Sequence, residues 1–189
     1  MRGFLDALEL DRVHYVGESI GGILGIAFAA KWPERLKSLT VCSSPTAIRP
    51  SARNALTSGE RELGSELARL GGGDWVKILI EQKVISGKNP PHISWVVNEW
   101  SKTPTHVLLG INRMLAHADI TPLLPLVKVP TLVLAPSRSP LTPLDDQLTI
   151  RNSIPNARFT VVEGPGHEIY VDEPEECINA VQKFLTILS

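Results

Sequence analysis

The stretch that decides the fold is Val13-His14-Tyr15-Val16-Gly17-Glu18-Ser19-Ile20-Gly21-Gly22. It begins with a short run of strand character, stops at a glycine, and continues into a segment rich in Gly, Ala, Ile and Leu that predicts a buried helix up to Trp32. The pattern around Ser19 is G-x-S-x-G, and small flanking residues allow a sharp strand-to-helix turn that exposes the serine hydroxyl. Such a pattern arises by chance about once in twenty chains of this length, and a tightly packed glycine turn is the alternative. The position between a strand and a helix favours a nucleophilic serine.

Outward from this turn, strands and helices alternate. Strands are expected at 13–16, 36–42, 130–135 and 158–162. Helices are expected at 20–32, 53–70, 74–86, 91–101, 104–117, 144–153 and 174–188. Strands that alternate with helices indicate an α/β fold with a parallel sheet, here of about four strands. We therefore expect a core formed by 1–45 and 119–189, interrupted by a helical insertion at 46–118.

A serine hydroxyl needs a neighbouring base, and His167 is the histidine best placed to serve. It follows Glu163-Gly164-Pro165-Gly166 directly after the last expected strand, so it lies at the same carboxyl edge of the sheet as Ser19. The other four histidines lie within the first strand or the insertion, where exposure or an internal hydrogen bond explains them: His14, His92, His106 and His117.

Three segments resemble the nucleophile-elbow, acid-loop and histidine-loop segments of α/β-hydrolases. They are FLDALELDRVHYVGESIGG at 4–22, VPTLVLAPSRSPLTP at 129–143 and VVEGPGHEIYVDEPEECINAVQKFL at 161–185. The insertion, with its exit at 118–124, is similar to the cap of enol-lactone hydrolases and related carboxylesterases. The resemblance implies a hydrolase for small carboxylic esters or lactones: Ser19 forms an acyl-enzyme, His167 moves the proton, and the Ile20 amide donates to the oxyanion. It implies no metal and no organic cofactor.

The third member of the expected triad departs from this family. Its acid loop commonly reads D-P-x-x-P, whereas this chain reads Ser139-Pro140-Leu141-Thr142-Pro143. Ser139 can hydrogen-bond the imidazole but cannot offset its positive charge, and changing the acid costs about 10⁴ in turnover in the best-studied serine protease. Asp145, Asp146 and Asp119 are the nearest other acids, and each is also explained as a helix cap or surface charge. Glu18 is expected to point elsewhere. Ser139 and Asp145 both remain candidates.

The expected sheet is also short, because the family sheet usually has eight strands. The second oxyanion donor of the family comes from an early loop that these residues do not include, and losing one donor typically costs about 10² to 10³ in rate. Strand 13–16 becomes an edge with unpaired backbone groups. Either the chain is a fragment of a larger hydrolase, or a second copy completes the sheet about a two-fold axis, which predicts a homodimer through this strand.

Helices of the insertion are expected to form a lid over the nucleophile. Trp75, Trp95, Trp100 and Met114 are candidates to line its pocket, although packing between the cap helices also explains them. Nothing in the insertion specifies a charged, nucleotide or peptide ligand, so the expected substrate is a modest apolar ester or lactone. A perhydrolase or carbon–carbon hydrolase on the same residues remains open.

Composition limits the other possibilities. The 189 residues include 19 basic and 20 acidic side chains without a block of like charge, which argues against nucleic acid or anionic lipid as a partner. The longest stretch without an ionisable side chain other than His, 19–30, is shorter than the roughly 20 residues of a membrane helix. The start lacks the features of a secretory signal, so the cytoplasm is expected. Cys42 and Cys177 are isolated and are expected to be buried thiols. The competing hypothesis is a catalytically impaired fragment or interaction module that retains the hydrolase fold.

Overall fold

The computed structural model describes residues 1–57, 64–164 and 166–188. Its centre is a sheet of four parallel strands in the order β1-β2-β3-β4. The strands are β1 (Val13–Glu18), β2 (Leu36–Cys42), β3 (Thr131–Pro136) and β4 (Arg158–Val162). This arrangement confirms the expected partial hydrolase sheet. Within the described residues β1 pairs with β2 alone, so β1 is an edge strand.

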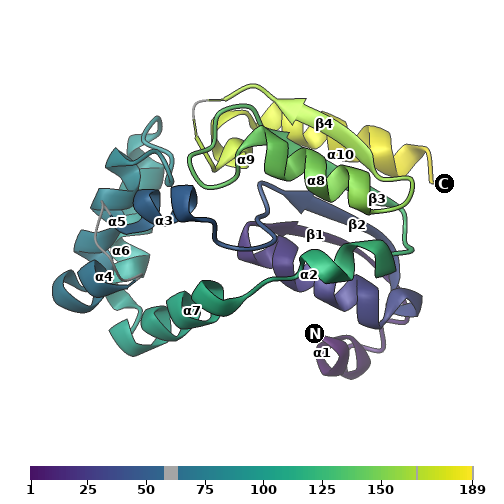
Figure 1. Cartoon of the computed structure of the whole chain (residues 1–189), viewed down its shortest axis with the longest axis horizontal. Coiled ribbons are helices and arrows are strands. Elements are labelled where there is room, and N and C mark those ends of the chain that lie inside the picture. Colours follow the sequence, from purple (N-terminus) through teal and green to yellow (C-terminus); the bar gives the residue numbers. More distant parts are fainter. Residues whose placement is uncertain (58–63, 165, 189) are drawn as a thin grey trace.

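Helices cover the two faces of this sheet (Figure 1). On one face lie α2 (Ile20–Lys31), η2 (Thr121–Leu126) and α8 (Leu144–Ser153), with α1 (Arg2–Ala7) beside them. On the other lie α9 (Ile169–Asp172) and α10 (Pro174–Thr186), and a 3-10 turn, η1 (Pro33–Arg35), connects α2 to β2. The alternation along the strands explains both layers, because successive side chains point to opposite faces. Val133 packs toward α2 and α8, whereas Leu132 and Leu134 pack toward α9 and α10.

The described residues between β2 and β3 also contain the helices of the insertion, called the cap below, which lies on the left in Figure 1. They are α3 (Pro50–Thr57), α4 (Ser65–Leu70), α5 (Gly72–Glu81), α6 (Pro90–Lys102) and α7 (Thr105–His117). Their buried apolar side chains, among them Leu67, Trp75 and Val76, form one cluster that also includes Leu141 from the loop after β3. Where the insertion joins the core, the Ile120 amide donates a hydrogen bond to the Thr46 carbonyl at 2.9 Å.

Two expected helices differ from those observed. The helix expected at 74–86 ends at Glu81, because Lys83 adopts a left-handed conformation with φ of 59°. The Val84 amide then donates to the Leu79 carbonyl at 2.8 Å, which satisfies the helix end. The helix expected at 53–70 is replaced by α3 and α4, and its residues 58–63 lie outside the described part of the chain.

Candidate active site

Ser19 lies on the turn between β1 and α2 in a conformation that few non-glycine residues adopt. Its φ is 49° and its ψ is −112°. Sparsely populated backbone conformations of this kind cost roughly 1–3 kcal/mol and cluster at functional sites. Here the turn is held from several sides: the Ser19 amide donates to the Cys42 carbonyl at 2.9 Å, and the Ser44 hydroxyl donates to the Ser19 carbonyl at 3.0 Å. The Tyr15 hydroxyl donates to the Gly21 carbonyl at 2.8 Å.

Two glycines are required by this turn, and only the first of them, Gly17, belongs to the G-x-S-x-G motif. A Cβ at Gly17 would collide with the Gly21 carbonyl, and one at Gly22 would collide with the Ser44 side chain. A Cβ at Gly21 would meet only the Tyr15 hydroxyl, at 3.8 Å. Gly17 and Gly22 therefore let the helix approach the strand closely, while Gly21 has room for a side chain.

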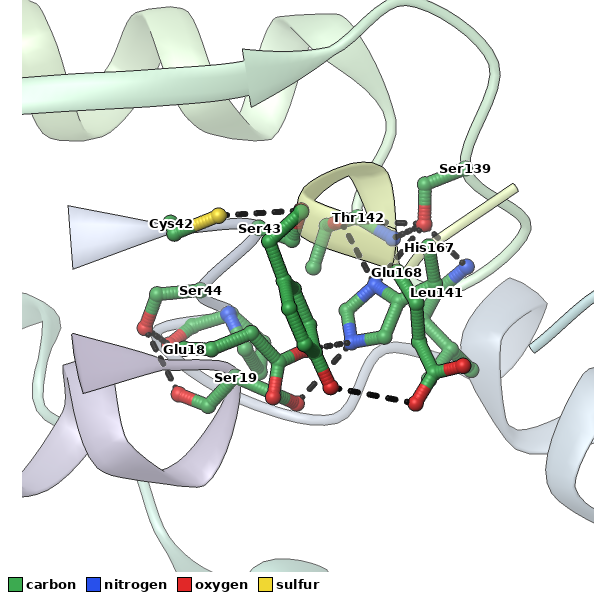
Figure 2. Close-up of polar contacts among 12 residues, drawn as sticks. Glu18, Ser19, Cys42, Ser43, Ser44, Ser139, Leu141, Thr142, His167 and Glu168 are labelled. Carbon is green, nitrogen blue, oxygen red and sulfur yellow. Dashed lines mark hydrogen bonds and ion pairs between the residues drawn. The ribbon is translucent and has the colours of Figure 1, made fainter. Parts of the chain in front are cut away.

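His167 reaches this serine, as the sequence led us to expect. Its Nε2 atom lies 3.0 Å from Ser19 Oγ, and the imidazole is 3% exposed (Figure 2). The ring approaches from the loop between β4 and α9, 148 residues further along the chain. Of the other histidines, His14 hydrogen-bonds Ser38 at the exposed end of the sheet, and His92 lies in the cap. The spacing between Ser19 and His167 suits proton transfer from the hydroxyl.

Two hydroxyl groups face the opposite nitrogen of this ring. Ser139 Oγ lies 3.1 Å from His167 Nδ1, and Thr142 Oγ1 lies 3.3 Å from it. Ser139 Oγ also accepts hydrogen bonds from the Leu141 amide at 3.2 Å and the Thr142 amide at 3.1 Å. Ser139 therefore occupies the place expected for the acid, next to a threonine that the sequence analysis did not single out.

The candidate aspartates lie elsewhere. Asp145 is exposed in the first turn of α8. Asp146 pairs with Arg49 at 2.7 Å. Asp119 accepts from the Thr121 amide at 2.9 Å, and hydrogen bonds from Thr121 lower the pKa of Asp119. None of these contacts brings an aspartate to the imidazole.

Glu18 differs from our expectation that its side chain points elsewhere. Its Oε1 atom lies 3.2 Å from His167 Nε2, on the same nitrogen as Ser19 (Figure 2). The register explains this, because Glu18 pairs with Cys42 and so projects to the face of the sheet that carries α9. His167 lies on the loop that enters α9, so its ring is on this same face of the sheet.

The residue after the histidine connects the cap to the core. Glu168 is 7% exposed, and its Oε2 atom accepts from the Ser86 amide at 2.7 Å and lies 3.1 Å from His92 Nε2. The Tyr170 hydroxyl donates to its Oε1 atom at 3.2 Å. Burial first, and then the charges of Glu168 and Glu18, raise the pKa of Tyr170, so this phenol stays a neutral donor. Sequence reasoning missed Glu168 and Tyr170, and their only signal was proximity to His167.

A cavity of about 420 Å³ opens above Ser19. Trp75, Trp95 and Trp100 all line it, but Met114 is not among the lining residues. Trp75 also donates to the Leu56 carbonyl at 3.3 Å and lies 5.4 Å from Trp100, ring centre to ring centre. The tryptophans thus pack the cap and face the cavity at once.

The amide of Ile20 lies at the start of α2, where a backbone N–H has no partner within the helix and the helix dipole is positive. Ile20 also lines the cavity, so the start of α2 borders the space above Ser19. Metal-ligand side chains do not gather in groups of three or more within the described ranges. Nor do these ranges contain a helix with the length and apolar character needed to cross a membrane.

Comparison with known proteins identifies the family. The profile described as alpha/beta hydrolase fold matches residues 1–174. The chain belongs to the α/β-hydrolase fold family. One relative is 3-oxoadipate enol-lactonase 1 of Acinetobacter baylyi, 26% identical over 182 residues that cover 96% of this chain and 66% of the relative. Another is 2-hydroxy-6-oxo-6-phenylhexa-2,4-dienoate hydrolase of Burkholderia cepacia, 26% identical over 183 residues, which are 88% of this chain and 60% of that one.

Among solved structures, a thermophilic esterase from Thermogutta terrifontis superposes with a TM-score of 0.80 at 25% identity, covering 98% of this chain and 69% of the esterase. The chain spans about two thirds of the length of these proteins. It is therefore a hydrolase-family chain with a partial hydrolase fold.

Proposed function

We propose that the chain hydrolyses small carboxylic esters or lactones through an acyl-enzyme on Ser19. The observation that carries this proposal is the 3.0 Å contact between Ser19 Oγ and His167 Nε2 on a strained turn. In the first step Oγ bonds to the carbonyl carbon while its proton passes to Nε2. The carbon–oxygen bond of the ester then breaks, and the departing alkoxide takes the proton from Nε2. Water repeats the two proton transfers and releases the acid.

The Ile20 amide supports the negative oxygen of the intermediate. Because His167 Nδ1 faces the Ser139 hydroxyl in place of a carboxylate, we propose activated esters or strained lactones as substrates, since their carbonyl groups need less stabilisation. The enol-lactonase name of the Acinetobacter relative supports this choice.

The cavity favours an uncharged substrate. Its wall is mainly apolar, and no lysine or arginine stands among the described residues that line it. Two carboxylates do line it, those of Glu18 and Glu168. An additional carboxylate on the substrate would have to lose water of hydration beside like charges. We also propose that the reaction takes place in the cytoplasm, where cysteines such as Cys42 and Cys177 stay reduced.

The competing proposal is a catalytically impaired module, which the hydroxyl of Ser139 in place of the acid favours. Hydrolysis of p-nitrophenyl acetate and butyrate separates the two when purified protein is compared with its Ser19→Ala and His167→Ala variants. We expect measurable turnover that both variants lose. A fluorophosphonate probe should label the protein but not Ser19→Ala. Equal rates in three folded samples, with no labelling, would establish the impaired module.

A further inference from the structure

The hydrogen-bonding groups around His167 determine which of its nitrogens carries the proton. A neutral imidazole has one N–H and one acceptor nitrogen. A base that removes the proton from Ser19 must have its free lone pair on Nε2, so the proton must be on Nδ1. In a complete triad a carboxylate fixes this state by accepting from Nδ1–H. Here Nδ1 faces two hydroxyl groups, which can both donate and accept.

The surroundings of Ser139 direct a hydroxyl hydrogen toward the ring. A serine oxygen has two lone pairs, and the amides of Leu141 and Thr142 point at them from 3.2 and 3.1 Å. Thr142 Oγ1 lies 3.0 Å from the same oxygen and 3.3 Å from His167 Nδ1. Because the acceptor capacity of Ser139 is filled by the two amides, its hydrogen goes either to Nδ1 at 3.1 Å or to Thr142 Oγ1, and in the second case the Thr142 hydrogen goes to Nδ1. Nδ1 is then the acceptor nitrogen.

The other side of the ring agrees. Glu18 Oε1 lies 3.2 Å from Nε2, and an ionised carboxylate can only accept. A hydrogen on Nε2 satisfies it, whereas a lone pair on Nε2 would face a negative oxygen. The opposite tautomer would also leave one of the two hydroxyl hydrogens, that of Ser139 or that of Thr142, without an acceptor among these groups in a buried site, where an unsatisfied group costs about 1–3 kcal/mol.

We propose that resting His167 carries its proton on Nε2, held there by the hydroxyl pair of Ser139 and Thr142 as donor and Glu18 as acceptor, in the tautomer that cannot accept the Ser19 proton. Hydrolysis requires the proton to move to Nδ1 first, so only the minor tautomer reacts. In the best-studied serine protease the wrong tautomer alone lowers kcat about 10⁴. Ser139 and Glu18 are positioning residues that keep the site in a low-activity state.

The hydrogen-bond donors around Ser139 Oγ could also bind a carboxylate. Two backbone amides, the Thr142 hydroxyl and Nδ1–H would supply four donors to an aspartate at position 139, and a carboxylate accepts about four hydrogen bonds. Ser139→Asp is therefore expected to fold and to move the proton to Nδ1.

The tautomer is read directly from ¹H–¹⁵N correlations of protein labelled with ¹⁵N-histidine. Spectra are recorded at pH 8, where an ordinary imidazole with a pKa of about 6.5 is neutral. The His167→Ala variant assigns the signal. We expect an acceptor-type Nδ1 shift and a protonated Nε2 in the wild type, and the reverse in Ser139→Asp. A protonated Nδ1 in the wild type would overturn the inference, whether or not the protein hydrolyses esters.

The kinetic part of this test rests on the proposed function. Ser139→Asp is expected to raise kcat for p-nitrophenyl butyrate at least tenfold with little change in KM. Arg138→Asp is the matched control, because Arg138 is exposed on the same loop and an aspartate there adds negative charge away from the ring. A tautomer that reverses while kcat stays at background in every variant would sink the proposed function and leave the inference standing. An equal gain in Arg138→Asp would count against the tautomer as the cause of the low rate.

Discussion

The carboxylate of Glu168 lies 3.1 Å from Nε2 of His92 and joins the cap to the loop that carries His167. Because Glu168 follows His167 directly, this contact fixes the loop from the cap side while Ser139 holds the ring from the core side. The position of the imidazole over Ser19 thus depends on both parts of the chain.

Loss of this contact is expected to destabilise the protein. Glu168→Ala leaves the buried Ser86 amide without its acceptor, which costs about 1–3 kcal/mol of unfolding free energy. Urea denaturation followed by tryptophan fluorescence measures the change. Glu175→Ala, an exposed acid in the first turn of α10, should stay within about 0.5 kcal/mol of the wild type. Equal stability of the two variants would show that the cap does not depend on Glu168.

The turn at Ser19 provides a comparison between adjacent glycines. Gly22→Ala is expected to cost about 1–3 kcal/mol of unfolding free energy and to lower the proposed esterase activity, because the new methyl group collides with Ser44. Gly21→Ala should be tolerated, since it has space and alanine is the better helix former. Thermal unfolding and turnover of both variants check this. A tolerated Gly22→Ala would mean that α2 can move away from β2 at little cost.

The sequence predicted only part of the site, because some of its contacts are set by the ends of strands and others by the packing of separate loops. Ser19 and His167 were predictable because each follows a strand end, and parallel strands bring these ends to one edge. Thr142 and Glu168 were not, because their partners come from separate loops whose packing no local pattern encodes.

Glu18 shows the same limit on a smaller scale. The motif gave its position, but the direction of its side chain followed from the register of β1 on β2, which turns it toward the face that carries α9 and toward His167. The fold was more accessible: four strands appeared at the expected places, since short runs rich in apolar and β-branched residues leave a strong pattern even where both faces are buried, as in β3. Helix ends in the cap were less accessible, as Lys83 shows, because the apolar pattern continues past the turn.

The two thiols should be unreactive in the folded protein. Burial raises the pKa of Cys42 to about 12 and that of Cys177 to about 11. Only thiolate reacts with disulfide reagents, so labelling at pH 8 should be slow before and rapid after unfolding in urea. Folding raises the pKa values of both thiols, so the folded state is favoured by keeping them protonated. This contribution to the free energy of unfolding is complete below about pH 8.5, the pKa of a free thiol, and is lost as the pH rises through the pKa values of the folded protein. Rapid labelling of both thiols in native protein would contradict the burial.

Substrate charge tests the lining of the cavity. The p-nitrophenyl ester of pentanoic acid should have at least a tenfold higher kcat/KM than the monoester of adipic acid, which adds a carboxylate. The physical reason is repulsion from Glu18 and Glu168 in a cavity whose described lining includes no lysine or arginine. Added salt should narrow the difference in kcat/KM between the two esters, because it screens the repulsion between the substrate carboxylate and those parts of Glu18 and Glu168 that contact water. A preference for the carboxylate ester would assign a different substrate class.

The edge of the sheet supports a proposal about assembly. Val16 is 58% exposed on β1, a strand whose outer side is unpaired among the described residues. Exposed edges of this kind pair with other strands, and pairing of two β1 strands about a two-fold axis would give one continuous sheet of eight strands.

Light scattering is therefore expected to give a mass about twice the 20.7 kDa of the chain. Val16→Lys should lower the mass to that of a monomer, because the two-fold axis brings two added charges together on the paired edge. The matched control is Ile178→Lys, which changes a residue of α10 that is 48% exposed and packs near β3 and β4, away from β1. A monomeric wild type that stays soluble at every concentration would exclude this dimer. Dissociation of Ile178→Lys alone would place the interface at the opposite end of the sheet.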